Sequence, residues 1–221
     1  MSGLQTIIDT CSKLEFDRRR IIGQSVSRSQ RIRTAERVAA QPFAIMVTPK
    51  PLFKVDQSRV LVEELFARDR FQESEIRLGS NPNLSYLVKY QGELADQATA
   101  ETITINTWTT NQITLGNLPA IGGSITSSTV LFQAGDFIQP ANSRYPYVVQ
   151  TAILRGTGST TTGTVNRSLI TSENINVVGQ TLKVGTDTSM RMIVTDIPSY
   201  QITQKNLMNF TGDFKLIEAI I

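Results

Sequence analysis

Residues 14–38 read LEFDRRRIIGQSVSRSQRIRTAERV, a stretch in which charged side chains are interleaved with β-branched and aromatic ones. Residues 14–26 are typical of an extended strand, in which Gly23 allows a bend. Residues 27–30 have the composition of a turn, and residues 31–38 have that of a returning strand. The stretch therefore predicts a long N-terminal β-hairpin.

The same stretch concentrates the positive charge of the chain. Residues 13–37 hold eight basic and three acidic side chains, a net charge of +5, whereas all 221 residues together carry +3. Two interpretations stay open: an arm that binds nucleic acid, or an arginine-rich hairpin that contacts other subunits, because arginine forks suit interface ion pairs. The candidate subunit-interface residues are Arg18, Arg19, Arg20, Arg28, Arg31, Arg33 and Arg37.

Apolar patterning predicts further strands and one helix after the hairpin. Residues 42–48 form a short apolar run bounded by prolines, which is typical of a buried strand. A suitable N-cap residue precedes a helix over about 57–70, whose apolar stripe would lie across a sheet. Two more strands are predicted at 75–78 and 84–90, joined by a turn at 81–83.

From Thr99 onward the chain becomes rich in Thr, Ser, Gly and Asn, and charged residues become sparse. Short strand-like segments are separated there by turn residues every 8 to 12 residues or so, the spacing of a small barrel or sandwich. They are 101–109, 126–132, 137–139, 147–153, 164–166 and 181–184. Longer apolar alternation resumes in 190–195, 199–203 and 213–219. We therefore predict a mainly β (β-rich α+β) fold with an outer domain, residues 1–102 and 187–221, and an inserted β-barrel domain at 103–186.

The composition argues against an enzyme. With no His and one Cys, the chain cannot supply a Cys/His zinc site, a Ser-His-Asp triad or a Cys-His pair. The Gly-rich loop at 156–163 lacks the Lys-Ser/Thr of a P-loop and precedes a predicted strand. Several carboxylates could in principle pair as in a glycosidase. These carboxylates are Glu93, Asp96, Glu101, Asp136 and Asp213. A glycosidase cleft usually offers several aromatic side chains on which sugars stack, whereas this chain has a single Trp. Asp136 is instead expected to close a turn through backbone N–H bonds. We predict no catalytic, metal or cofactor site.

The sequence also predicts a chain that is neither membrane-embedded nor secreted by an ordinary signal. No apolar run approaches the roughly 20 residues of a membrane helix, and the first residues lack the basic-then-apolar pattern of a signal peptide. A lone Cys that can form no intrachain disulfide fits synthesis in the cytoplasm.

Four segments resemble structural proteins at the baseplate end of tailed-phage tails: LEFDRRRIIGQ (14–24), SQRIRTAER (29–37), GDFIQP (135–140) and GDFKLIE (212–218). The most similar group is the tail-tube-related proteins that start or cap the tube above the baseplate hub. The resemblance implies an antiparallel β-sandwich or barrel with one flanking helix and a long hairpin. It also implies that six copies close into a ring through which DNA and tape-measure protein pass. The family has no active-site residues to carry over.

The leading expectation is therefore a non-enzymatic virion protein, a tube initiator or distal tail ring that joins the tail tube to the baseplate hub and takes part in genome ejection. Its expected partners are further copies of itself in a hexameric ring, the tail tube protein, the hub and other baseplate proteins, with DNA only in transit and no membrane. Its expected location is the phage tail, after synthesis in the host cytoplasm. Two other classes stay open: a nucleic-acid-binding β-barrel that uses the basic hairpin, and a receptor- or carbohydrate-binding tail module.

Overall fold

Five antiparallel strands form the central sheet, in the order β1-β4-β18-β15-β6. Their bounds are β1 Lys13–Asp17, β4 Ala44–Thr48, β6 Ser74–Arg77, β15 Ser189–Asp196 and β18 Phe214–Glu218. Buried and exposed side chains alternate along β18 and β6, so that one face of the sheet packs on the core and the other faces solvent. β4, β15 and β18 confirm the strands predicted in 42–48, 190–195 and 213–219.

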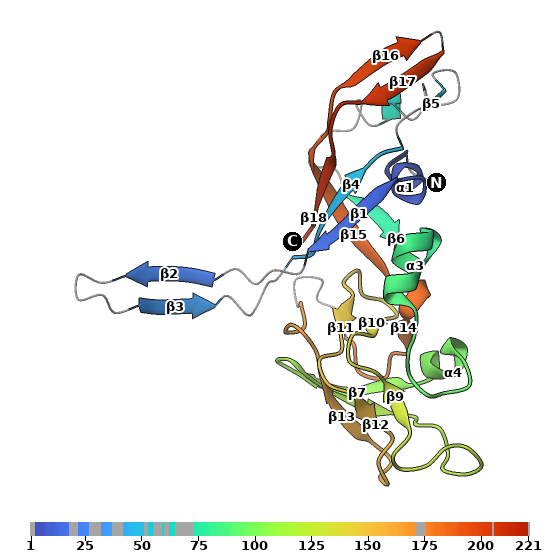
Figure 1. The fold of residues 1–221 in the computed structure, drawn as a ribbon. Coiled ribbons are helices and arrows are strands. Elements are labelled where there is room, and N and C mark those ends of the chain that lie inside the picture. The colour runs from blue at the N-terminus through green and yellow to red at the C-terminus, as the bar shows by residue number, and fades with distance from the viewer. Residues whose placement is uncertain are drawn as a thin grey trace.

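This computed structural model describes residues 3–17, 22–26, 32–36, 42–50, 53–54, 59, 62–64, 73–170, 176–204 and 206–220. Within these residues the chain is mainly β, with several antiparallel sheets and a few short helices (Figure 1). The molecule is elongated, with the central sheet in its middle. At one end lies a three-stranded sheet in the order β16-β17-β5, formed by Tyr200–Gln204, Leu207–Phe210 and Phe53–Lys54.

The predicted N-terminal hairpin is divided between the central sheet and a projection. β1 pairs with β4, whereas β2 (Ile22–Val26) pairs with β3 (Ile32–Glu36) in a separate two-stranded sheet. Figure 1 shows β2-β3 pointing away from the rest of the molecule. The hairpin is therefore confirmed over β2 and β3. The single strand predicted over 14–26 is wrong, because residues 13–17 form the edge of the central sheet.

Residues 84–90, predicted as a strand, lie mostly in helix α3 (Pro82–Val88). Leu84 and Val88, four residues apart, are both buried on one face of the helix, whereas Tyr86 is 82% exposed. Asn81 caps the helix, because its Oδ1 accepts a hydrogen bond from Leu84 N at 2.9 Å, and proline suits the first helical turn. The Asn-Pro pair that predicted a turn is a helix start.

The helix predicted at 57–70 lies largely outside the described residues, of which residue 59 and residues 62–64 are helical. The expectation of one flanking helix is wrong, because α3 is joined by α1 (Gly3–Asp9) and α4 (Gln97–Glu101). Asp96 caps α4 by accepting the backbone N–H of Thr99 at 2.7 Å. Two 3₁₀ turns, η1 (Leu78–Ser80) and η3 (Gly185–Asp187), complete this helical side.

Helix α1 covers the β6 edge of the central sheet. The bond from Leu78 N to Thr188 O, 3.1 Å, sets the ladder so that Arg77 directs its backbone N–H and C=O away from β15. The Gln5 side chain takes both groups: Oε1 accepts from Arg77 N at 2.9 Å, and Nε2 donates to Arg77 O at 3.3 Å. A side-chain amide thus stands where a further strand would pair.

Residues 103–186 form three small antiparallel sheets, and their described residues form no closed barrel, which corrects the predicted inserted barrel. The sheets have the orders β13-β8-β7, β11-β10-β14 and β12-β9. Their strands are β7 Thr104–Thr109, β8 Gln112–Gly116, β9 Val130–Phe132, β10 Phe137–Pro140, β11 Tyr147–Val148, β12 Ile153–Leu154, β13 Thr161–Thr164 and β14 Leu182–Val184. These strands are short and belong to separate sheets, whereas a closed barrel needs one continuous sheet whose first and last strands pair.

Two clusters of buried apolar side chains lie along the molecule. The first packs the central sheet against α1 and α3, and the second lies among the small sheets of 103–186. Phe137 and Val148, from the small sheets, belong to the first cluster, so the two parts share packing. The domain boundaries at 102/103 and 186/187 remain predictions.

Candidate assembly surfaces

The projecting hairpin is the segment that sequence reasoning singled out for subunit contacts. Among the candidate arginines, Arg33 lies on β3 opposite Ser25 of β2. The others lie outside the described residues: Arg18, Arg19, Arg20, Arg28, Arg31 and Arg37. By chain order, three of them precede β2, two lie between β2 and β3, and one follows β3. The sequence thus assigns positive charge to both ends of the hairpin.

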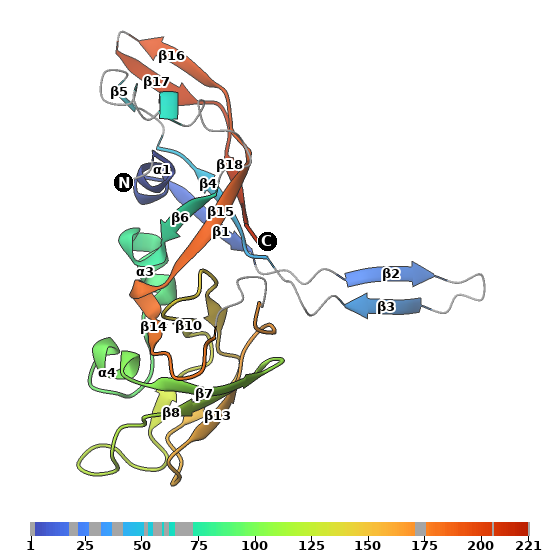
Figure 2. The same cartoon turned by 180° about the vertical axis from the view of Figure 1, so that it is seen from behind.

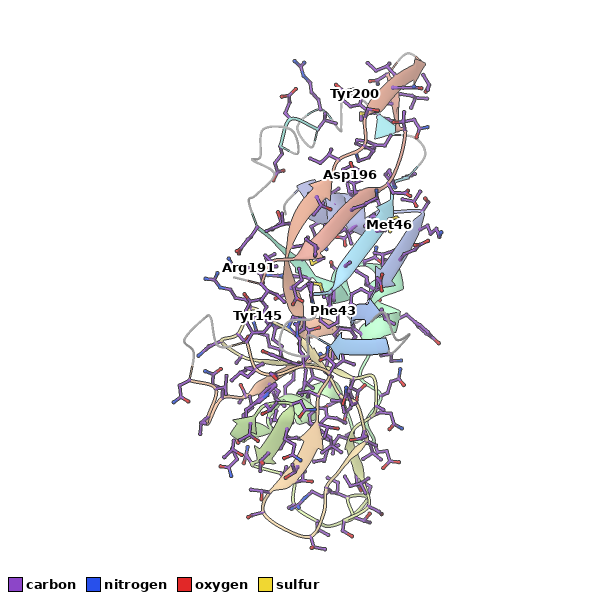
Figure 3. All side chains as sticks on the ribbon, turned by 90° about the vertical axis from the view of Figure 1, so that its left-hand side faces the viewer. Phe43, Met46, Tyr145, Arg191, Asp196 and Tyr200 are labelled. Carbon is purple, nitrogen blue, oxygen red and sulfur yellow. The ribbon has the colours of Figure 1, made fainter. Side chains whose placement is uncertain are left out.

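A groove of about 520 Å³ lies at the base of the hairpin, on the solvent-facing side of β1, β4 and β18. Ala44, Met46 and Ile217 give it apolar walls, while Glu15 and Asp17 bring negative charge from β1 and Lys215 brings positive charge from β18. Figure 3 looks onto this face of the central sheet and labels Met46. The hairpin leaves the sheet after β1 and returns just before β4, so hairpin and groove adjoin.

The charge beside the groove is partly paired. Lys13 Nζ donates to Glu15 Oε1 at 2.5 Å, and this bond raises the pKa of Lys13 above its ordinary value. Asp213, which sequence reasoning considered as a catalytic carboxylate, adds a smaller electrostatic contribution in the same direction.

Helices α1, α3 and α4 lie on the opposite side of the molecule from the hairpin (Figures 1 and 2). On α3, Tyr86 is 82% and Leu87 41% exposed. The 3₁₀ turn η3 packs against both α3 and α4. Gly185 of η3 lies so close to the two helices that a Cβ added there would be 2.9 Å from both Val88 O and Gln97 Oε1. We call this surface the helical flank, defined by Tyr86, Leu87, Asp96, Glu101 and Asp187.

The helical flank is mainly acidic. Hydrogen bonds from the Thr99 side chain and backbone hold the pKa of Asp96 below its usual range. Burial raises the pKa of Glu101, and the neighbouring Asp187 carboxylate acts in the same direction. Lys89 is an exposed basic residue at the end of α3.

Four of the carboxylates considered for glycosidase chemistry, Glu93, Asp96, Glu101 and Asp136, accept hydrogen bonds from backbone N–H groups. Asp136 Oδ2 accepts from Gln133 N at 2.8 Å, and its Oδ1 accepts from Gln91 N at 3.0 Å, which confirms the predicted turn-closing role. Burial raises the pKa of Asp136. Glu93 Oε2 accepts from Val130 N at 2.7 Å. These hydrogen bonds give the carboxylates a structural role.

The Gly-rich loop at 156–163 surrounds an arginine of its own chain. Arg155 Nη1 donates to Gly156 O at 3.1 Å and to Gly158 O at 2.6 Å, and its Nε donates to Pro119 O at 2.6 Å. A phosphate-binding loop directs backbone N–H groups to its ligand, whereas here carbonyl oxygens face a guanidinium.

Within the described residues, no three Cys, Asp or Glu side chains come together where they could hold a metal ion. The described helices include none that is long and apolar enough to cross a membrane.

A buried ion pair that sequence reasoning missed joins the two core clusters. Arg167 Nη1 and Nη2 donate to Glu218 Oε2 and Oε1 at 2.5 and 2.7 Å, and both side chains are 0% exposed. Nη2 also donates to Pro146 O at 2.6 Å, and Phe43 N donates to Glu218 Oε2 at 3.1 Å. The guanidinium lies over the rings of Phe43 and Tyr147, 4.6 and 5.2 Å from their centroids.

The hairpin with its groove and the helical flank are thus unlike surfaces on opposite sides of one chain. The contacts described within each surface position side chains. No protein-family model matches the chain, and no curated protein sequence matches it significantly.

Proposed function

We propose that this chain is a non-enzymatic structural protein of a phage tail, which forms a ring at the tube–baseplate junction, joins the tail tube to the hub and encloses the DNA channel. The observation that carries the proposal is the hairpin β2-β3, which leaves the molecule as a two-stranded sheet (Figure 2). A two-stranded hairpin is marginally stable in water and needs a further strand or a packing surface. In a ring, a neighbouring copy supplies that surface.

The four segments that resemble tail proteins support the proposal of a tail protein, because they fall on strands of the central sheet, the hairpin and the small sheets. Segment 14–24 overlaps β1 and β2, and segment 29–37 contains β3. Segment 212–218 contains β18 at the centre of the central sheet, and 135–140 contains β10.

The positions of the surfaces support a ring over a symmetric dimer. The hairpin and the helical flank lie on opposite sides, so one copy can present its hairpin to the flank of the next (Figure 1). Contacts between unlike surfaces repeat from copy to copy and close into a ring when the rotation between copies allows it.

The test is the mass of the purified full chain, measured by size-exclusion chromatography with light scattering over a range of concentrations, followed by electron microscopy. We expect a closed ring near six copies. Arg18→Glu with Arg20→Glu should prevent assembly and leave the circular dichroism spectrum unchanged. The matched control is Lys50→Glu with Lys54→Glu, the same charge change at exposed residues outside the hairpin.

A chain that stays monomeric at every concentration would overturn the proposal. If that monomer bound DNA with an affinity that falls steeply with salt, the nucleic-acid-binding alternative would replace it.

A further inference from the structure

We infer that α3 of one copy docks in the groove at the base of the next copy's hairpin, with Tyr86 entering the groove and the acidic residues of the helical flank facing the hairpin arginines. This inference rests on the proposed function, because it requires copies to meet head to tail. It names the two surfaces that form each subunit contact.

The first argument is the unsatisfied apolar surface of α3. Leu84 and Val88 fix its inner face in the core, each 1% exposed, so the helix is held in place. Its outer face presents Tyr86 and Leu87 at 82% and 41% exposure. Tyrosine at such a position is a typical interface anchor, since it buries a large ring and keeps its hydroxyl at the wet rim.

The second argument is the fit of the groove to such an anchor. Its volume of about 520 Å³ falls among pockets that enclose small ligands, which range over roughly 300–1,000 Å³. Ala44, Met46 and Ile217 offer apolar walls for a ring, and methionine adapts well to aromatic neighbours. Ile217 is 37% exposed on a strand whose alternate residues are buried.

The third argument is charge complementarity between the two sides. The helical flank carries Asp96, Glu101 and Asp187, with Lys89 as the basic residue beside them. The segment that contains the hairpin carries +5. Arginine pairs with carboxylates in a bidentate fashion, and opposite charges set the orientation of approach. Only a second copy brings these surfaces together, because within one chain they face opposite ways (Figures 1 and 2).

The first experiment removes the anchor. Tyr86→Ala with Leu87→Ala should weaken each subunit contact by about 30-fold, the equivalent of a hot-spot loss near 2 kcal/mol at 1.4 kcal/mol per tenfold. Sedimentation measures the concentration at which the ring dissociates. The matched control is Leu154→Ala with Ile202→Ala, which truncates exposed apolar side chains elsewhere and should leave that concentration unchanged.

The second experiment traps the contact. In a Cys11→Ser background, Met46→Cys with Tyr86→Cys should give oxidised multimers larger than dimers on a denaturing gel, because each copy offers one thiol to each neighbour. Met46→Cys with Ile202→Cys should not give such a series.

The third experiment exchanges the charges. Arg31→Glu with Arg33→Glu, and separately Ala98→Arg with Asp187→Arg, should each prevent rings. An equal mixture of the two variants should restore rings, in which the copies alternate. Ala98 is exposed on α4, so its replacement leaves the Asp96 cap intact.

Failure of the inference and failure of the proposed function give different results. A wild-type monomer overturns both. The docking of α3 alone is overturned if the wild type forms a ring but the three experiments fail. In that case the Tyr86→Ala, Leu87→Ala variant still forms rings, the cysteine variant gives no cross-linked series, and mixing the two charge variants restores no rings.

Discussion

Removing Arg167 tests whether the buried ion pair holds the two core clusters together. Arg167→Met keeps an unbranched apolar stem but removes the guanidinium, and it leaves Glu218, a 0% exposed carboxylate, without its ionic partner. Breaking a buried pair from one side costs about 3–5 kcal/mol, because an uncompensated charge stays in a medium of low polarity. Since about 1 kcal/mol lowers the Tm of a chain of this size by about 2–4 °C, we expect a fall near 10 °C.

The double variant separates the ion pair from simple packing. Arg167→Met with Glu218→Leu contains no buried charge, but it leaves Phe43 N–H and Pro146 C=O without these partners, at about 1–3 kcal/mol each. We therefore expect the double variant to be about as stable as either single variant. The coupling between the two positions would then equal the cost of one single change, about 3–5 kcal/mol, which is large against the few tenths typical of independent sites.

Urea unfolding followed by tryptophan fluorescence and by far-ultraviolet circular dichroism provides the measurement. Trp108 reports on the small sheets, since its ring centroid lies 4.6 Å from that of Tyr147. If Arg167→Met costs under about 1 kcal/mol, or if the two single changes add, the ion pair does not join the clusters as described.

Three further predictions concern a tyrosine, a glycine and the segment 104–185. Burial raises the pKa of Tyr90 to about 12, so its folded form keeps the proton longer than the unfolded form, and stability should fall between pH 10 and 12. Comparing wild type with Tyr90→Phe in alkaline unfolding would show this, and equal profiles would contradict it. Gly92→Ala would overlap the Tyr90 hydroxyl and should cost about 1–3 kcal/mol, whereas Gly116→Ala, whose Cβ would lie 3.5 Å from its nearest neighbour, should change urea stability little. Replacing 104–185 by a Gly/Ser linker removes the arginine partner of Glu218 and also Phe137 and Val148, which pack in the first cluster. Urea unfolding should therefore show the remainder to be more stable with Glu218→Leu than without it, and equal stability would count against the ion pair.

Sequence patterning predicts the central sheet better than the helical side. In 213–219, Phe214 and Leu216 alternate with other residues, and this period of two is typical only of a half-buried strand. In 84–90 the apolar residues fit both the period of two of a strand and the period of nearly four of a helix. Only the capping residue Asn81 distinguishes the helix from the strand. β8 escapes prediction because its turn contains Thr110 at φ 48°, a conformation usually signalled by glycine or asparagine.

The candidate surfaces divide in the same way. The arginine-rich hairpin is visible in sequence because its charge is local. The ion pair is invisible on the arginine side, since Arg167 pairs with a residue 51 positions away and lies in a polar loop. Glu218 alone gives a signal: it continues the inward register of Phe214 and Leu216, and a carboxylate in that register requires a partner. The helical flank needs the tertiary contact of η3 with α3 and α4, which no local pattern encodes.

The amide of Gln5 has a consequence for anyone who shortens or tags this protein. An uncapped strand edge is a template for unwanted pairing, and β6 is short and would be left with the backbone of Arg77 open. Loss of the first helix would thus open a pairing edge at the same time as it removed Leu4, Ile7 and Ile8 from the first core cluster. An N-terminal truncation should form amorphous or fibrous aggregates, which a survey of terminal variants could mistake for true assembly.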